Sequence, residues 1–192
     1  NMSYKSNQQN KQIECISFEE YEKQFNKAQN YIRNGDIYQI NYSIQYKTKK
    51  AINLKDLYNK IRHNSPAPYG AFINCFGYQI ICNSPELFFK KKGKAILTKP
   101  IKGTINRGKD EIDDENLKNK LLNSKKDEAE LTMITDLERN DLNKICKVNS
   151  VKVNKLRDIK AYKYLFHTVS SISGELTQNF KIGEIMLSFF IS

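Results

Sequence analysis

The run TKPIKGT at residues 98–104 places a lysine in an unusual setting. Lys102 lies between an isoleucine and Gly103, and Lys99 lies three residues upstream. A lysine is nucleophilic only when it is neutral, which requires burial or a nearby positive charge. Gly103 has no side chain, so a ligand can approach the backbone closely. Lys102 is therefore a candidate nucleophile at a strand end, and the alternative is a structural lysine.

Carboxylates at two further places in the sequence could act as a general acid or bind a metal ion. Glu86 follows a proline in NSPELFF and precedes apolar residues, and a partly desolvated carboxyl can act as a general acid. Asp127 and Glu130 lie three residues apart in KKDEAELTMITDLERND, on one face of an expected helix. Oxygen ligands on a helix with room for water suit Mg²⁺. For Glu86 the alternative is an exposed glutamate at the start of a strand. For Asp127 and Glu130 the alternative is a solvated acidic helix face.

Two uncharged or weakly basic side chains complete the set of candidates. His167 lies in the apolar run YLFHTVSSISGEL, as a catalytic group or as a core histidine that holds a hydrogen bond. Gln39 lies in DIYQINYSIQYK, where apolar residues alternate with amides and hydroxyls. This alternation predicts a strand over 37–46 with one polar face, which lines a cavity or faces water.

Helices and strands that would position these residues follow from local patterns. SFEE at 17–20 is a capping box that begins a helix, and Gly35 is placed to end it. Periodicity predicts further helices over 54–62, 113–123, 125–143 and in the final IGEIMLSFFIS. Turn residues separate expected strands at 71–76, 78–83, 86–90, 95–98, 151–154, 158–163 and 166–175. The pattern predicts an α+β fold after a disordered segment over residues 1–12.

Composition and charge argue against several classes of protein, namely nucleic-acid-binding, membrane and zinc proteins. The net charge of +11 comes from 32 basic residues of which only five are arginine, and the lysines are scattered as in solvated surfaces. We therefore expect no nucleic-acid partner. No apolar run approaches the ~20 residues of a membrane helix and no signal peptide is visible, which predicts a cytoplasmic protein with no membrane association. The four cysteines form no C-x-x-C pair, which argues against a zinc site.

Five motifs, in the order in which they occur along the chain, resemble those of a known protein family. They are YIRNGDIYQINYS, NSPELFF, TKPIKGTINRG, KKDEAELTMITDLERNDL and FHTVSSISGEL. Together they resemble the chorismate-binding family, which includes anthranilate synthase component I, aminodeoxychorismate synthase component I, and the isochorismate and salicylate synthases. The resemblance covers about residues 17 to 191. It implies a layered sandwich of mainly antiparallel sheets flanked by helices, with residues 13–192 forming the N-terminal part of the catalytic domain.

The resemblance also implies roles for the candidate residues. Lys102 would attack C2 of chorismate to give a covalent intermediate, Glu86 would protonate the departing C4 hydroxyl, and His167 would lie near the ring. Substrate contacts would come from Gly103, Thr104 and Gln39. Half of a Mg²⁺ shell would come from Asp127 and Glu130. A glutamine amidotransferase subunit or fused domain would supply ammonia.

The form of two motifs favours one member of the family. Anthranilate synthases usually carry alanine where this chain has Lys102, and the isochorismate and salicylate synthases carry a lysine where it has Gln39. The resemblance therefore favours aminodeoxychorismate synthase component I, in 4-aminobenzoate and folate biosynthesis. Anthranilate synthase component I in tryptophan biosynthesis is the alternative, and a non-catalytic, partner-binding remnant is an alternative of another class.

The family pattern continues beyond the end of this sequence. After a helix like IGEIMLSFF, members carry a Pro-x-Gly-Thr-x-x-Gly-Ala-Pro-Lys segment and the second pair of metal glutamates. We therefore expect the chain to be truncated at its C-terminus, as a fragment that is inactive or very weakly active by itself.

Overall fold

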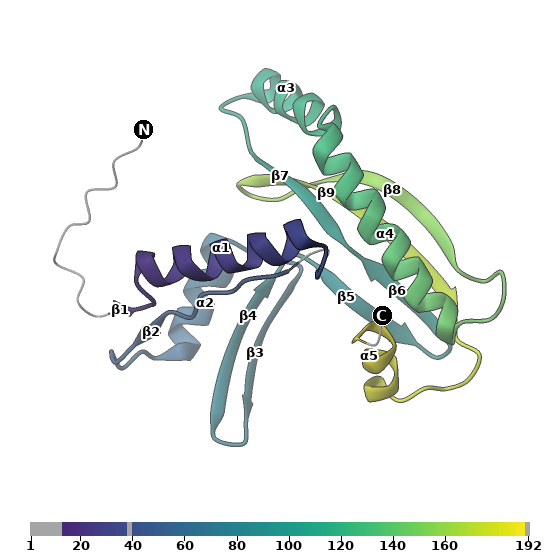
Figure 1. The fold of residues 1–192 in the computed structure, drawn as a ribbon, viewed down its shortest axis with the longest axis horizontal. Coiled ribbons are helices and arrows are strands. Elements are labelled where there is room, and N and C mark those ends of the chain that lie inside the picture. Colours follow the sequence, from purple (N-terminus) through teal and green to yellow (C-terminus); the bar gives the residue numbers. More distant parts are fainter. Residues whose placement is uncertain (1–12, 38–39, 191–192) are drawn as a thin grey trace. The chain divides into compact units, whose positions relative to one another are not determined.

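The computed structural model describes residues 13–37 and 40–190 of the chain (Figure 1). The predicted disorder of residues 1–12 and the candidate Gln39 therefore lie outside the described residues. The chain divides into two compact units, Asn1–Asn53 and Leu54–Ser192.

The first unit contains one long helix whose ends are specified locally. Helix α1 spans Phe18–Asn34, and the Ser17 hydroxyl accepts a hydrogen bond from the Glu20 amide at 3.1 Å. Gly35 ends the helix with φ 78°, in the left-handed region that favours glycine. Both signals were read in the sequence and are confirmed. No residue of α1 is buried.

The prediction of a strand over 37–46 is wrong for the residues that the structure describes there. Strand β2 spans only Lys47–Thr48, which pair antiparallel with β1, Ile13–Glu14, while residues 40–46 form no strand. Alternation of polar and apolar residues predicts two faces, but a strand also needs a neighbour for its backbone N–H and C=O groups. In this unit β1 supplies that neighbour for two residues of β2 only.

The second unit begins with a helix and a hairpin. Helix α2 spans Leu54–Asn64, and strands β3, Tyr69–Cys75, and β4, Tyr78–Ser84, pair antiparallel. The Tyr58 ring of α2 lies 5.9 Å from the Phe72 ring of β3, between centroids. All these elements were expected within a few residues. Like α1, they contain no buried residue.

A five-stranded antiparallel sheet follows, with β9 in the middle. Strands β6 and β7 pair one after the other along one edge of β9, β8 pairs along the other edge, and β5 lies outside β6. The strands are β5 Leu87–Lys92, β6 Ala95–Lys99, β7 Ile101–Asn106, β8 Lys152–Ala161 and β9 Leu165–Glu175. The α+β class with mainly antiparallel sheets is confirmed.

Two details of this sheet differ from the expectation. Lys102 is not at a strand end, because Pro100 separates β6 from β7 and Lys102 is the second residue of β7. Residues 151–154 and 158–163 are not two strands, because β8 runs continuously from Lys152 to Ala161. Its register with β9 shifts twice, and Arg157 has φ 56°, so the irregular backbone absorbs the break that the sequence pattern suggested.

Three helices complete the described chain: α3 Glu111–Leu122, α4 Lys125–Ile145 and α5 Ile182–Phe190. Figure 1 shows α4 lying along the sheet. On β9, alternate residues are completely buried on the face toward α4: Phe166, Thr168, Ser170 and Ile172. Thr135 of α4 donates a hydrogen bond to the Ser170 hydroxyl at 2.9 Å, which fixes that face.

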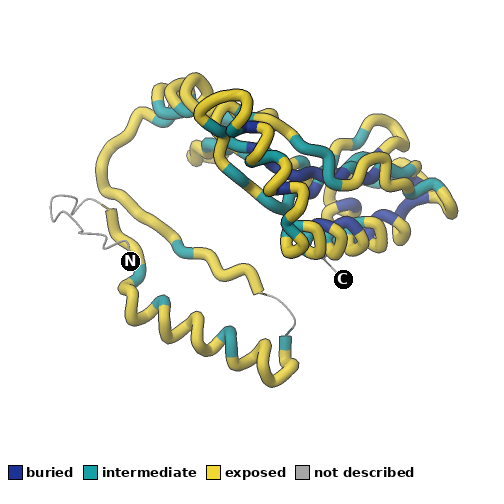
Figure 2. Tube along the Cα trace, turned by 90° about the horizontal axis from the view of Figure 1, so that it is seen from above, coloured by how far each residue is buried: buried dark blue, intermediate teal, exposed yellow. Residues whose placement is uncertain are grey.

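The apolar core lies where the sheet, α4 and α5 meet. It consists of Ile96, Leu142, Ile145, Cys146, Ile172, Leu176 and Ile185. Figure 2 shows the buried residues gathered in this part of the chain. Among the helices that the structure describes, none has the length and apolarity needed to cross a membrane.

Candidate functional site

Gly103 interrupts the regular pairing of β7 with β9. Lys102 pairs with Thr168, whereas Thr104 pairs with His167, so one residue of β7 is extra and forms a bulge. Gly103 has φ 83°, and a Cβ built on it would lie 2.9 Å from Thr168 Oγ1. The Thr168 hydroxyl donates a hydrogen bond to the Lys102 carbonyl. Glycine is therefore required here by both backbone conformation and space.

The carboxylates predicted to bind metal lie beside this bulge. A Cβ on Gly103 would lie 3.1 Å from Asp127 Cβ, so α4 and β7 approach closely at this point. The Ser124 hydroxyl caps α4 and accepts a hydrogen bond from the Asp127 amide at 3.3 Å. Glu130 follows one turn later, with its Oε1 3.9 Å from Lys126 Nζ. Asp127 and Glu130 offer two hard oxygen donors, which fit part of a Mg²⁺ shell completed by water.

Thr104 and His167 form a pair on neighbouring strands. Thr104 Oγ1 and His167 Nδ1 are 2.8 Å apart. His167 is only 7% exposed, and the Tyr162 ring packs edge-on against it with a centroid distance of 5.3 Å. The hydrogen bond and the aromatic contact fix the orientation of the imidazole, so its Nε2 is the ring nitrogen left for another partner.

Glu86 links the start of β5 to the start of β7. Its Oε1 accepts a hydrogen bond from the Ile101 amide at 2.7 Å. The Ser84 hydroxyl bonds both the backbone N–H and the carbonyl of Glu86, at 3.3 and 3.1 Å. The Glu86 carboxyl is therefore held next to the residue that precedes Lys102.

The far end of β7 is anchored to α3. Arg107 Nε donates to Asp114 Oδ2 at 2.8 Å, and Asp114 Oδ1 accepts from the Gly108 amide at 2.5 Å. The Arg107 guanidinium lies 4.7 Å above the centroid of the Phe166 ring. The hydrogen bonds from Arg107 hold the pKa of Asp114 below its usual value. These contacts hold the strand that carries Lys102, Gly103 and Thr104.

Seven of the eight predicted site residues thus lie around β7, on both faces of the sheet. The register pairs Lys102 with Thr168, on the face toward α4, and Thr104 with His167, on the other face. The position of a Cβ on Gly103 lies toward Asp127 of α4. Glu86 reaches the same strand at Ile101, and Glu130 lies one turn from Asp127 on α4. The seven residues therefore lie on two faces of one sheet, and their roles stay predictions.

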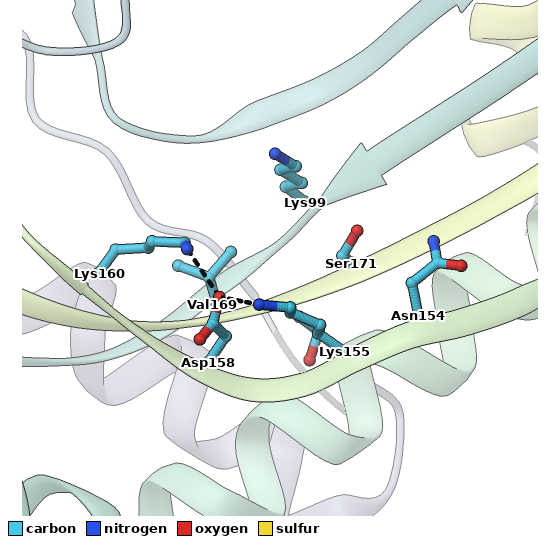
Figure 3. A pocket seen from close by; sticks show the side chains of 8 residues that line it. Lys99, Asn154, Lys155, Asp158, Lys160, Val169 and Ser171 are labelled. Atoms are coloured by element: carbon cyan, nitrogen blue, oxygen red, sulfur yellow. Dashed lines mark hydrogen bonds and ion pairs between the residues drawn. The ribbon is translucent and has the colours of Figure 1, made fainter.

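A cationic hollow of about 240 Å³ lies on the face away from α4 (Figure 3). Three lysines, Lys99, Lys155 and Lys160, line it, against the single carboxylate of Asp158. Lys160 Nζ lies 2.7 Å from Asp158 Oδ2 and Lys155 Nζ lies 3.4 Å from it. These contacts, chiefly that from Lys160, lower the pKa of Asp158. The excess of lysine gives this face a positive potential that attracts anions.

One titratable residue of α4 that was not among the predicted site residues is Glu138. The residues of α4 that face the sheet recur every three or four positions: Leu131, Thr135, Glu138, Leu142 and Ile145. A carboxylate in such a stripe is the signal that was available, because charged side chains rarely occupy sheet-facing positions. The pKa of Glu138 is raised to about 7, chiefly by burial and in smaller part by the nearby charges of Glu86 and Asp141, while the Thr98 hydroxyl opposes the rise.

Comparison with known proteins identifies relatives of the chain. The sequence model of a family described as chorismate binding enzyme matches residues 2–191. Aminodeoxychorismate synthase component 1 of Bacillus subtilis is 40% identical over 164 residues, which cover 85% of this chain and 35% of that protein. The chloroplastic anthranilate synthase alpha subunit 1 of Arabidopsis thaliana is 34% identical, over 89% of this chain and 29% of that protein. The chain thus spans about a third of the length of these relatives.

Solved structures share the fold. Anthranilate synthase component I from Streptococcus pneumoniae superposes with a TM-score of 0.80 at 28% identity, covering 92% of this chain and 39% of that one. A 2,3-dihydroxybenzoate-specific isochorismate synthase from Bacillus anthracis superposes with a TM-score of 0.70 at 20% identity, covering 92% of this chain and 50% of that one. The layered α+β architecture expected from the motifs agrees with the first of these structures.

Proposed function

Because the chain belongs to the family of chorismate-binding enzymes, we propose that it is part of an aminodeoxychorismate synthase component I. The proposed reaction converts chorismate and ammonia to 4-amino-4-deoxychorismate. The observation that carries the proposal is a lysine at position 102, next to the glycine bulge that approaches Asp127. The 40% identity with the Bacillus subtilis enzyme supports it.

The first step forms a covalent intermediate. Neutral Lys102 Nζ attacks C2 of chorismate, the ring double bonds shift, and the C4–O bond breaks. Glu86 gives its proton to the departing hydroxyl, which leaves as water. The hydrogen bond from the Ile101 amide holds the Glu86 carboxyl near the strand that carries Lys102. A positioned general acid of this kind accelerates the step by about 10²–10⁴-fold.

The second step releases the enzyme. Ammonia attacks C4, the double bonds shift back, and the C2–N bond to Lys102 breaks, so the lysine returns to its free form. The proton that the new amine loses returns to Glu86. His167, whose imidazole is held by its hydrogen bond with Thr104, is the residue that we propose to lie near the substrate ring.

The anionic groups of the substrate need positive partners. Asp127 and Glu130 would hold Mg²⁺, which when bound neutralises a substrate carboxylate. The three lysines of the hollow in Figure 3 would attract anions to the opposite face of the sheet, where His167 and Thr104 also lie. We propose that a glutamine amidotransferase subunit or domain supplies the ammonia and that the reaction takes place in the cytoplasm.

Anthranilate synthase component I is the second candidate, favoured by the Arabidopsis thaliana relative and the Streptococcus pneumoniae structure. In that reaction nitrogen adds at C2 and pyruvate leaves, so no enzyme nucleophile at C2 is needed. A lysine at position 102 argues against it.

The experiment that tests the proposal is the Lys102→Ala substitution in the purified natural protein, assayed with chorismate and ammonium. We expect the rate of 4-amino-4-deoxychorismate formation to fall at least about 100-fold, because the covalent route is lost. Intact-mass spectrometry of the unchanged protein with chorismate alone should show a covalent adduct on Lys102. The exposed Lys109, in the loop before α3, supplies the matched control as Lys109→Ala.

The product formed from chorismate distinguishes the candidate functions. Fluorescent anthranilate together with pyruvate from the unchanged protein would replace the proposal with the second candidate. A Lys102→Ala protein of unchanged rate would refute the covalent role. No turnover of chorismate by the natural protein would favour a non-catalytic, partner-binding role.

A further inference from the structure

We propose that the cationic hollow of Figure 3 is a binding site for a small dicarboxylate. One carboxylate of the ligand binds between Lys155 and Lys160. The other carboxylate binds Lys99, across the sheet. The inference rests on the hollow alone and does not depend on the proposed function.

The first cationic group of the hollow is the pair of Lys155 and Lys160 on β8. Both ammonium groups contact the same atom, Asp158 Oδ2, at 3.4 and 2.7 Å. The shared carboxylate therefore holds two like charges close together and neutralises only one of them. An ammonium group has three N–H donors, so each lysine keeps donors for a further acceptor. A carboxylate of a ligand can use these donors and offset the remaining positive charge.

The second cationic group lies on the other side of β9. Thr98 of β6 pairs with Ile172, so Lys99 lies beside Ser171 one position further along the two strands. Lys155 pairs with Ser171 from the opposite edge of β9. The side chains of Lys99, Ser171 and Lys155 thus form a row across three strands (Figure 3). Within the described residues, neither Lys99 Nζ nor the Ser171 hydroxyl has a hydrogen-bond or ion-pair partner.

Charge, spacing and size together select the ligand. Three lysines and one carboxylate leave an excess of two positive charges in the hollow. Strands β6 and β8 lie on opposite edges of β9, so their backbones are roughly 10 Å apart. Two cationic groups separated by a strand match two separate carboxylates better than one compact oxyanion. The volume of about 240 Å³ is below the range of about 300–1,000 Å³ for drug-sized ligands, so the ligand is small.

The residues of β9 below the hollow give the ligand an apolar floor. Val169 is 6% exposed and alternates with Ser171 and His167 on this face of the strand, so it can contact the carbon atoms between the two carboxylates. His167 pairs with Lys160, so the hollow continues toward the hydrogen-bonded pair of Thr104 and His167. The dicarboxylate is therefore either chorismate, which has two carboxylates, or a second molecule of the same class.

Titration of the ¹⁵N-labelled natural protein with succinate, followed by NMR of the backbone amides, tests the site. We expect saturable shifts centred on Lys99, Lys155 and Ser171, with an affinity that falls as NaCl is added. Lys99→Gln and Lys155→Gln should each weaken binding about two- to fivefold, the size of an exposed ion pair. The control Lys109→Gln removes an exposed lysine before α3 and should leave the dissociation constant unchanged. Equal affinities in all four proteins would overturn the site.

Asp158→Asn separates loss of charge from damage to the sheet. The substitution removes the single carboxylate among the described residues that line the hollow and frees Lys155 and Lys160. Binding of succinate should therefore become about two- to fivefold tighter, opposite to the effect of the lysine variants. Unchanged or weaker binding in Asp158→Asn would overturn the proposal.

Other anions at equal ionic strength test the class of ligand. Inorganic phosphate and acetate should bind more weakly than succinate, because each has only one anionic centre. Phosphate that binds as tightly as succinate, and is weakened by the same two lysine substitutions, would overturn the assignment to a dicarboxylate.

Chorismate distinguishes the two sources of the ligand. If chorismate displaces succinate and binds more weakly to Lys155→Gln, the hollow holds the substrate of the proposed reaction. If chorismate binds without displacing succinate, the hollow holds a second dicarboxylate. Binding of succinate requires no turnover, so a natural protein that binds succinate but makes no 4-amino-4-deoxychorismate would refute the proposed function and leave this inference standing.

Discussion

The elements before β5 and those that follow differ in how far their side chains are buried. Among the described residues, every buried one lies at Ile96 or later in the chain, although α1 is amphipathic and carries Phe18 and Phe25. The difference teaches that apolar patterning and burial are separate properties. A helix acquires its stripe from sequence alone, but it buries that stripe only where another element packs against it.

The largest expected effect is in the core around α4. Leu142 is completely buried, so Leu142→Ala should lower the free energy of unfolding by about 2–5 kcal/mol through lost packing and a cavity. Phe25 of α1 is 45% exposed, and Phe25→Ala should cost less than about 1 kcal/mol. Urea denaturation followed by circular dichroism measures both. Equal losses would mean that α1 is buried against a surface that the described residues do not provide, and would break the comparison.

Two glycines with similar backbone conformations sharpen the same contrast. Gly103 in β7 and Gly77 between β3 and β4 have φ 83° and 78°. A Cβ on Gly77 would meet nothing within 4 Å, so Gly77→Ala should cost only the conformational strain of about 1 kcal/mol. Gly103→Ala adds the close approach to Thr168 and Asp127 and should cost about 3 kcal/mol. Denaturant midpoints of the two variants compare them directly, and equal shifts would show that the bulge yields easily.

A smaller effect depends on pH. The pKa of Glu138 is raised on folding to about 7, so its stabilising contribution is present below the usual glutamate value and is lost as pH rises through 7. Relative to the unchanged protein, Glu138→Gln should therefore gain stability between pH 5 and pH 8, by on the order of 2 kcal/mol. Thermal unfolding at the two pH values measures this gain. A constant difference would show that Glu138 is ionised throughout the range.

Features that depend on contacts between residues close in the sequence could be predicted, and features that depend on distant contacts could not. Ser17 and Gly35 act within one helical turn, so the ends of α1 were found to the residue. The strand over 37–46 was not, because strand pairing depends on a partner distant in sequence. The grouping of Glu86, Lys102 and Asp127 rested on resemblance, since three separate elements bring them together. Glu138 was not among the predicted site residues, because the sequence does not show which stripe of α4 packs against the sheet.

The bulge at Gly103 makes the two faces of β7 independent of each other. In a regular strand Lys102 and Thr104 would share a face, and a change in the size of one would disturb the other. With the extra residue, Lys102 pairs with Thr168 while Thr104 keeps its bond to His167. The residue at position 102 can therefore be exchanged without moving the imidazole. A fold with this bulge can accept substitutions at position 102 while the hydrogen-bonded pair of Thr104 and His167 is inherited intact.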